Sequence, residues 1–123
     1  MTNKTLRILI ADEQHFHRMK TERLFNQLDY YRVAPVQSLA EMLSLVEYGC
    51  EPFDLVVINA SLAVGALDLP GFFLDNSQVR HALIYASAMP DFASIQRLMT
   101  LIDPPACEAA PSLNQERYRQ RIG

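Results

Sequence analysis

The sequence predicts an α/β domain built on a parallel sheet, because strand-like and helix-like segments alternate along the whole chain. Two apolar runs, at 55–58 and 82–85, are continuous, as expected of strands covered on both faces. The pattern Ser-Leu-Ala-Glu at 38–41 matches a capping box at the start of a helix. These observations together indicate strands alternating with crossover segments, one of which is irregular.

The amino-terminal half is expected to contain two strands and two helices. The first strand covers 6–11, and a second short strand covers 31–36. Between them, a helix from about 15 to 28 has apolar or small residues at helical spacings of three and four, namely Thr21, Leu24, Phe25 and Leu28. After the capping box, the apolar stripe of the next helix is formed by Leu39, Met42, Leu43 and Val46.

The segment that follows the third strand is expected to be irregular. Gly65, Pro70 and Gly71 interrupt it, and both proline and glycine disfavour the interior of a helix. We therefore expect a long loop over residues 60–77 with at most a short helix, and we expect this segment to be the most mobile or remodelled part of the chain.

The carboxyl-terminal part is expected to add a fourth helix, a weak fifth strand and a last helix. Asp91 can cap the fourth helix, which ends before the prolines at 104–105. The fifth strand covers 106–110, and a second capping-box pattern at 112–115 opens a helix that ends near residue 122. The predicted order is five strands alternating with five crossovers.

Composition indicates one small domain that works with protein partners. A chain of 123 residues with 50% hydrophobic content fits a single core over 1–123 and leaves no room for an output domain. No secretory signal or membrane-spanning run is evident, which favours a cytoplasmic protein. A net charge of -3 and a pI near 5.5 argue against a nucleic-acid-binding surface. Cys50 and Cys107 have no metal-like spacing.

Polar residues follow two of the predicted strands. Asp12 and Glu13 come directly after the first strand, and Asn59 closes the apolar run 54–59. Open parallel sheets place their sites at the carboxyl ends of strands. Together these segments resemble the receiver domain of response regulators, the phosphorylation-switched module of bacterial two-component signalling, and the resemblance covers nearly the whole chain. It implies a flavodoxin-like three-layer sandwich with a five-stranded parallel sheet in the order 2-1-3-4-5.

The resemblance implies that the phosphoacceptor site is degenerate. Asp12 and Glu13 match the acidic pair that holds magnesium in this family, since a hard cation prefers carboxylate oxygens. Asn59 stands where the family has its reactive aspartate. An amide has no anionic oxygen to attack phosphorus, and it also removes one of the charges that would hold the metal. Any magnesium binding is therefore expected to be weak, in the millimolar range or worse.

Three further family positions are also changed. Ala86 aligns with the family's Ser or Thr after the fourth strand, although a shift of one residue would place Ser87 there. Ala110-Pro111 matches the family's Lys-Pro pair without the ammonium, and Cys107 falls on the switch aromatic. Phosphoryl transfer needs a nucleophile, metal charge, a hydroxyl donor and a cation, and each is lost or weakened here. The resemblance therefore implies a pseudo-receiver that is not an enzyme and that needs no cofactor.

The function implied is binding, independent of phosphorylation, to a histidine kinase, another regulator or a second copy of the chain, and not to nucleic acid. Receivers commonly pair through the face formed by helix four, strand five and helix five, so the candidate interface consists of Phe92, Ile95, Met99, Arg117, Tyr118 and Arg121. Phe16 and Met19 fall off the apolar face of the first helix. Unless a small rotation of that helix buries them, they are exposed beside the site edge and mark a second possible interaction surface.

Other interpretations stay open. An acidic pair after a strand is often a solvated turn or helix start, and Asn59 could be an ordinary strand-end residue. Residual phosphotransfer through Ser61 or Ser87 is an alternative, although neither has an evident neighbouring base. A flavodoxin-like cofactor-binding domain is disfavoured because no glycine-rich loop follows the first strand. The histidines at 15 and 17 diverge in direction on a helix, which favours a surface role.

Overall fold

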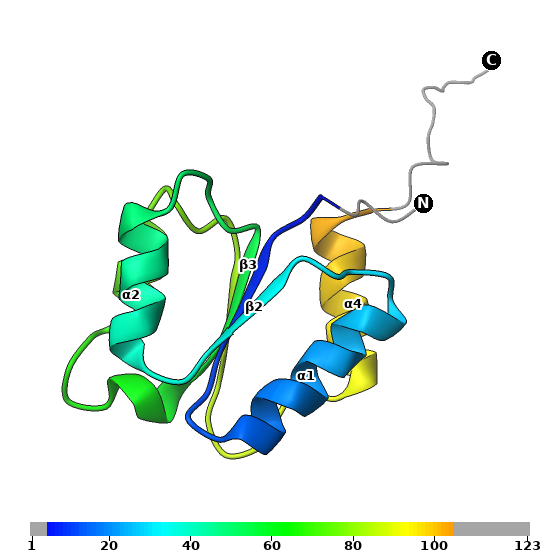
Figure 1. Cartoon of the computed structure of the whole chain (residues 1–123), viewed down its shortest axis with the longest axis horizontal. Helices are drawn as coiled ribbons and strands as arrows, with labels where there is room; N and C mark the ends of the chain where they lie inside the picture. Colours follow the sequence, from blue (N-terminus) through cyan, green and yellow to red (C-terminus); the bar gives the residue numbers. More distant parts are fainter. Residues whose placement is uncertain (1–4, 105–123) are drawn as a thin grey trace.

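A computed structural model describes residues 5–104 of the chain. Its sheet has parallel strands in the order β2-β1-β3-β4, with helices on both faces (Figure 1). The strands are β1 (Ile8–Ala11), β2 (Val33–Val36), β3 (Leu55–Asn59) and β4 (Ala82–Tyr85). The helices are α1 (His15–Gln27), α2 (Leu39–Tyr48), α3 (Leu69–Asp75) and α4 (Phe92–Ile102), with a 3-10 turn, η1 (Ala60–Ala63), after β3. The predicted α/β class and the order of the first four strands are confirmed.

The core is divided by the sheet into two layers of side chains. In β1, Ile8 and Ile10 pack toward α1 and α4, whereas Leu9 and Ala11 pack toward α2 and α3. β3 alternates in the same way, and its first four residues are fully buried. A parallel sheet with helices on both faces leaves no solvated side, which is why these strands read as continuous apolar runs.

The two predicted helix caps that lie in the described residues are formed. The Ser38 hydroxyl accepts a hydrogen bond from the Glu41 backbone N–H at 3.2 Å, and the Glu41 carboxylate accepts one from the Gln37 N–H at 2.8 Å. The Asp91 carboxylate accepts from the Ser94 N–H at 2.8 Å at the start of α4. Each cap satisfies a backbone donor that has no partner within its helix.

The third crossover is irregular, as predicted. After η1 the chain turns at Gly65, whose φ of +74° is readily adopted only by a residue without a Cβ. Helix α3 is then only seven residues long. Pro70 is tolerated because it lies in the first turn, where the backbone N–H would have no helical partner. A short helix inside a long connection is what the glycines and proline of this segment predict.

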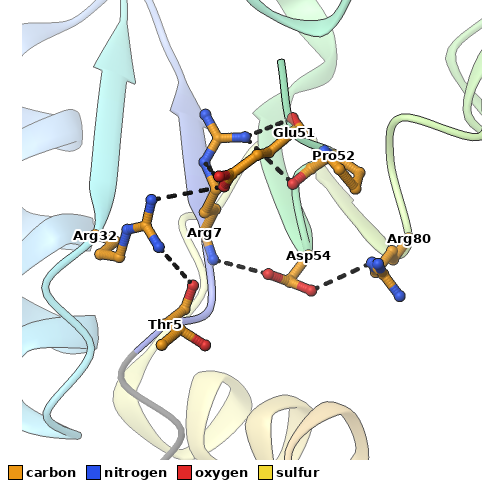
Figure 2. A network of polar contacts seen from close by, with 7 residues as sticks. All are labelled: Thr5, Arg7, Arg32, Glu51, Pro52, Asp54 and Arg80. Atoms are coloured by element: carbon orange, nitrogen blue, oxygen red, sulfur yellow. Dashed lines mark hydrogen bonds and ion pairs between the residues drawn. The ribbon is translucent and has the colours of Figure 1, made fainter. Parts of the chain in front are cut away.

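A network of charged side chains ties together the opposite edge of the sheet, where the strands begin (Figure 2). The Arg7 backbone N–H donates to the Asp54 carboxylate at 2.8 Å, and the Arg80 guanidinium lies 3.4 Å from the same carboxylate. Arg7 and Arg32 both face Glu51, at 3.8 and 3.7 Å. Exposed ion pairs contribute little individually, but this set links the segments that enter all four strands.

Some sequence-based predictions need correction or lie beyond the described residues. β4 is less covered than predicted, because Ala82 is exposed and Leu83 and Ile84 are only half-buried. The predicted fifth strand at 106–110 and the last helix lie outside the described residues. Within residues 5–104, no helix is both long and apolar enough to span a membrane.

Helix α4 contributes to the core two of the residues that were predicted to form an interface, Ile95 and Met99. Ile95 and Met99 are 0% and 3% exposed and pack in the layer between α1, α4 and the sheet. This burial excludes both from the candidate interface of the isolated chain, whereas Phe92 remains 37% exposed. The apolar side chains of Ile95 and Met99 therefore face the sheet.

We predict that Ile95→Ala lowers the free energy of unfolding by about 2–5 kcal/mol, because it leaves a cavity in a closely packed layer. Leu101→Ala is the matched control: it lies on the same helix, its side chain is 80% exposed, and it should change stability by less than about 0.5 kcal/mol. Urea denaturation of both variants measures the difference. Equal effects would show that the assigned face of α4 is wrong.

Candidate functional site

Three polar side chains occupy one row across the carboxyl ends of three strands. Strand pairing places Asn59 beside Tyr85, and Ala11 beside Ile58, so Asp12 follows β1 at the level of Asn59. The residues two positions earlier, Ile10 and Val57, pack toward α1 and α4. Because side chains alternate along a strand, the row lies on the α1 side of the sheet. The register therefore builds a polar cluster at the edge that the sequence indicated.

The Asp12 carboxylate is the centre of this cluster. It is fully buried, and one oxygen, Oδ2, accepts hydrogen bonds from the Tyr85 hydroxyl and from the Asn59 amide at 3.2 Å. His17, in the first turn of α1, places its Nδ1 3.2 Å from the same oxygen. The second oxygen, Oδ1, accepts from the Gln14 backbone N–H at 2.9 Å. A buried carboxylate is stable only with such partners.

The balance of burial and hydrogen bonding keeps Asp12 ionised. Burial of the carboxyl raises its pKa, but the bonds from Tyr85, Gln14, Asn59 and His17 together outweigh burial, so the pKa of Asp12 lies below its ordinary value of 3.8. Burial also raises the pKa of the Tyr85 hydroxyl, and the bond to Asp12 and its negative charge raise it further. At neutral pH the Asp12 carboxylate is therefore an anion, and it is held by hydrogen bonds within the chain.

Asn59 uses both ends of its amide in this site. Its Nδ2 donates to Asp12, and its Oδ1 accepts from the Ser61 backbone N–H at 3.0 Å, which caps the turn η1. An aspartate could accept from Ser61 but could not donate to Asp12. The asparagine is therefore chemically matched to its two neighbours, one acceptor and one donor.

The residues at this edge do not fit a magnesium ion. Both oxygens of Asp12 already accept protein hydrogen bonds, and a cation would have to displace those donors. Glu13 is exposed and is not among the hydrogen-bond partners of the Asp12 carboxylate, and Asn59 adds no charge. Among the described residues, no three His, Cys, Asp or Glu side chains come together as a possible metal site. Magnesium strongly prefers several oxygen ligands in octahedral geometry, which this edge does not supply.

The other predicted site residues that the structure describes form no hydrogen bond to the Asp12 carboxylate. Ala86 and Ser87 are both exposed in the bend after β4. Phe16 and Met19 are exposed on α1, as predicted for residues that fall off its apolar face. Six of the predicted positions lie outside the described residues: Cys107, Ala110, Pro111, and the interface candidates Arg117, Tyr118 and Arg121.

Two members of the cluster were missed by the sequence analysis. Tyr85 was assigned only to an apolar run, yet its hydroxyl bonds Asp12; its place at the end of a strand, like Asn59, was the available signal. His17 was predicted to have a surface role, but its ring is half-buried and faces Asp12. The prediction was wrong because it compared His17 only with His15. His15 instead lies 3.5 Å from the Arg18 guanidinium.

The sequence matches no protein-family model, and no curated protein is similar enough to be matched to it. What defines the class of this protein is therefore its architecture and its site: an α/β domain with a parallel sheet in the order 2-1-3-4 and a buried carboxylate cluster at the carboxyl edge.

We predict that Asn59→Asp destabilises the protein at pH 7 by on the order of 2–3 kcal/mol, because it places two carboxylates about one hydrogen-bond length apart. The deficit should shrink as the pH falls toward 4, where one of the pair takes up a proton. Asn59→Ala is the control, since it removes the amide without adding a charge, and its deficit should not recover on acidification. Urea unfolding at several pH values tests this, and a pH-independent deficit in Asn59→Asp would contradict it.

We predict that Tyr85→Phe lowers the free energy of unfolding by roughly 1.5–3 kcal/mol, the range for a hydrogen bond to a charged group. Because the folded pKa of Asp12 is depressed, its contribution to stability is present above its ordinary pKa and is lost as the pH falls through the folded value. Without the Tyr85 bond the folded pKa rises toward 3.8, so less stability is lost in acid. Unfolding curves from pH 7 down to acid measure both effects; an unchanged acid dependence would argue against the bond.

Proposed function

We propose that this protein is a phosphorylation-independent pseudo-receiver with a flavodoxin-like, five-stranded fold that acts by protein–protein interaction in a two-component-type pathway. The observation that carries the proposal is the bond between the Asn59 amide and the buried Asp12 carboxylate. This bond lies at the edge of the sheet formed by the carboxyl ends of the strands, where a receiver would carry out phosphoryl transfer. The four described strands, in the order 2-1-3-4, are compatible with this fold.

The chemistry of the cluster supports loss of phosphoryl acceptance. A phosphoryl acceptor needs an anionic oxygen that can reach phosphorus and a cation that neutralises the transferred group. Asn59 supplies no such oxygen, and the Asp12 oxygens face protein donors. Asp12 is also fully buried, so it cannot take over the role of the nucleophile without opening of the site.

The same bonds support a domain that is held in one conformational state. A receiver transmits a signal because phosphorylation stabilises one of its two conformations more than the other. Here the edge is joined across β1, β3, β4 and α1 by hydrogen bonds within the chain. A phosphodonor therefore cannot stabilise one conformation of this domain over another. The surface that binds the partner is always present, with or without a phosphodonor.

The proposed partners are a histidine kinase, another regulator or a second copy of the chain, in the cytoplasm. On the α4 side the described part of the proposed interface is Phe92, which is exposed at the first position of the helix. Arg117, Tyr118 and Arg121 complete the proposed interface. Magnesium is not required, since the acidic pair does not converge: Asp12 is buried and Glu13 is exposed.

We predict that the protein gains no phosphoryl group from acetyl phosphate and magnesium, measured by intact mass, whereas a receiver with an acceptor aspartate, treated in parallel, gains one. Asn59→Asp should restore little, because Ala86 and Ala110 leave the added group without hydroxyl and ammonium partners. A stoichiometric gain on the native chain would overturn the proposal. If that gain maps to Ser61 or Ser87, unconventional phosphotransfer is the better description.

A further inference from the structure

Helix α1 exposes a stripe of aromatic, apolar and basic side chains. Four exposed side chains form this stripe: Phe16, Met19, Lys20 and Arg23. Phe16 is three and four residues before Met19 and Lys20, and Arg23 is four and three residues after them, which places them on neighbouring turns of one helix surface. The Phe16 ring is 62% exposed, and the Lys20 ammonium lies 6.0 Å from its centroid. Among the described residues, neither Lys20 nor Arg23 forms an ion pair with a carboxylate. This α1 stripe is basic on a chain whose net charge is negative.

Helix α2 exposes side chains of the opposite charge. It carries Glu41 and Glu47 and no basic residue, and two of its exposed side chains are apolar, Leu45 and Tyr48. A groove of about 380 Å³ lies along this exposed face, where α2 meets the end of β2. Its lining is mostly apolar, with Glu41 at its rim: Val36, Ala40, Glu41, Ser44 and Leu45. We call this surface the α2 groove.

These two surfaces complement each other but cannot meet within one chain. The α1 stripe offers exposed apolar side chains beside the cations of Lys20 and Arg23. The α2 groove offers an apolar hollow with the Glu41 carboxylate at its rim, and Glu47 is exposed further along the same helix. In the fold, α1 and α2 cover opposite faces of the sheet, so the sheet separates the α1 stripe from the α2 groove (Figure 1). Charge complementarity is a main determinant of which surfaces associate. The surface that fits the α1 stripe is therefore present on every other copy of the same chain.

We propose that copies of this protein associate head to tail, with the α1 stripe of one copy seated on the α2 groove of another. Phe16 enters the groove beside Leu45, and Lys20 and Arg23 face the carboxylates of Glu41 and Glu47. Extension of the sheet through β2 is a poorer route, because Pro35 removes a backbone donor from that edge strand. The contact is heterologous, so it forms a closed ring if the rotation between successive copies closes, and otherwise it grows into an open chain of copies.

This inference goes beyond the proposed function and does not depend on it. It rests on exposed residues of α1 and α2, which are neither members of the Asp12 cluster nor residues of the interface proposed on α4. A chain that accepts phosphate could still associate in this way, and a pseudo-receiver could exist as a monomer. The two proposals therefore fail by different measurements: mass gain for the first, and oligomeric state for the second.

A charge-swap experiment tests the contact with the full chain. Sedimentation velocity over a concentration series reaching the millimolar range should show the wild-type mass rising above 14.0 kDa. Lys20→Glu with Arg23→Glu should weaken association roughly tenfold or more, since it places like charges opposite each other. Ser44→Lys with Glu47→Lys should do the same from the other side. Glu41 is kept because its carboxylate caps α2.

The decisive sample is an equimolar mixture of the two double variants. Each variant alone opposes like charges, but in the mixture the reversed α1 stripe meets the reversed α2 groove and the two native surfaces also meet. Association should therefore return, and it should weaken as salt is raised. Arg97→Glu on α4 and Leu74→Ala, whose side chain is 86% exposed, are controls that should leave association unchanged.

Three results would overturn the inference. The wild-type chain could keep a mass of 14.0 kDa at every concentration. The mixture of double variants could remain as monomeric as its components. The Arg97→Glu control could weaken association as much as the α1 substitutions, which would show a general charge effect. Circular dichroism of each variant establishes that it is folded before its mass is compared.

Discussion

The site depends on a single buried charge, the Asp12 carboxylate. Removing a carboxylate from water is costly unless hydrogen bonds replace the lost hydration. Here the replacement donors come from separate parts of the chain: a loop N–H, a ring on α1, an amide on β3 and a hydroxyl on β4. The strands and α1 must therefore keep their relative positions for the anion to stay satisfied. The Arg18 guanidinium strengthens this link by donating to the Asp12 carbonyl at 2.7 Å.

The row that surrounds Asp12 exists only because the strands are held in register, and the opposite edge of the sheet contributes to that. There, the Arg7 N–H donates to the Asp54 side chain while the Arg7 carbonyl accepts from the Asp54 N–H at 2.9 Å. The Arg7 guanidinium also lies over the Phe53 ring, 4.3 Å from its centroid. A slip of one residue between β1 and β3 would break these contacts and would turn Asn59 to the other face. The contacts at both edges of the sheet therefore depend on the same register between β1 and β3.

The arrangement also separates the surfaces available for binding from the buried site. The cluster directs its polar atoms inward, toward one carboxylate, and leaves little polar capacity for a ligand. The side chains available to a partner lie on the helices. The exposed surface of α1 is basic and apolar, and that of α2 is acidic and apolar. Partner recognition by such a chain is a matter of helix surfaces, which need no chemical event at the sheet edge.

The sequence by itself determined what depends on near neighbours. The pattern of near neighbours predicts several features that the structure contains. They are the caps at Ser38 and Asp91, the short α3 after Gly65, the apolar strands and the exposure of Phe16. The polar edge at Asp12 and Asn59 followed from strand ends alone. Only the tertiary structure decided that Tyr85 and His17 complete that edge, and that Ile95 and Met99 belong to the core. Those outcomes depend on strand register and on which face of a helix meets the sheet, and both are fixed by contacts between segments far apart in the chain.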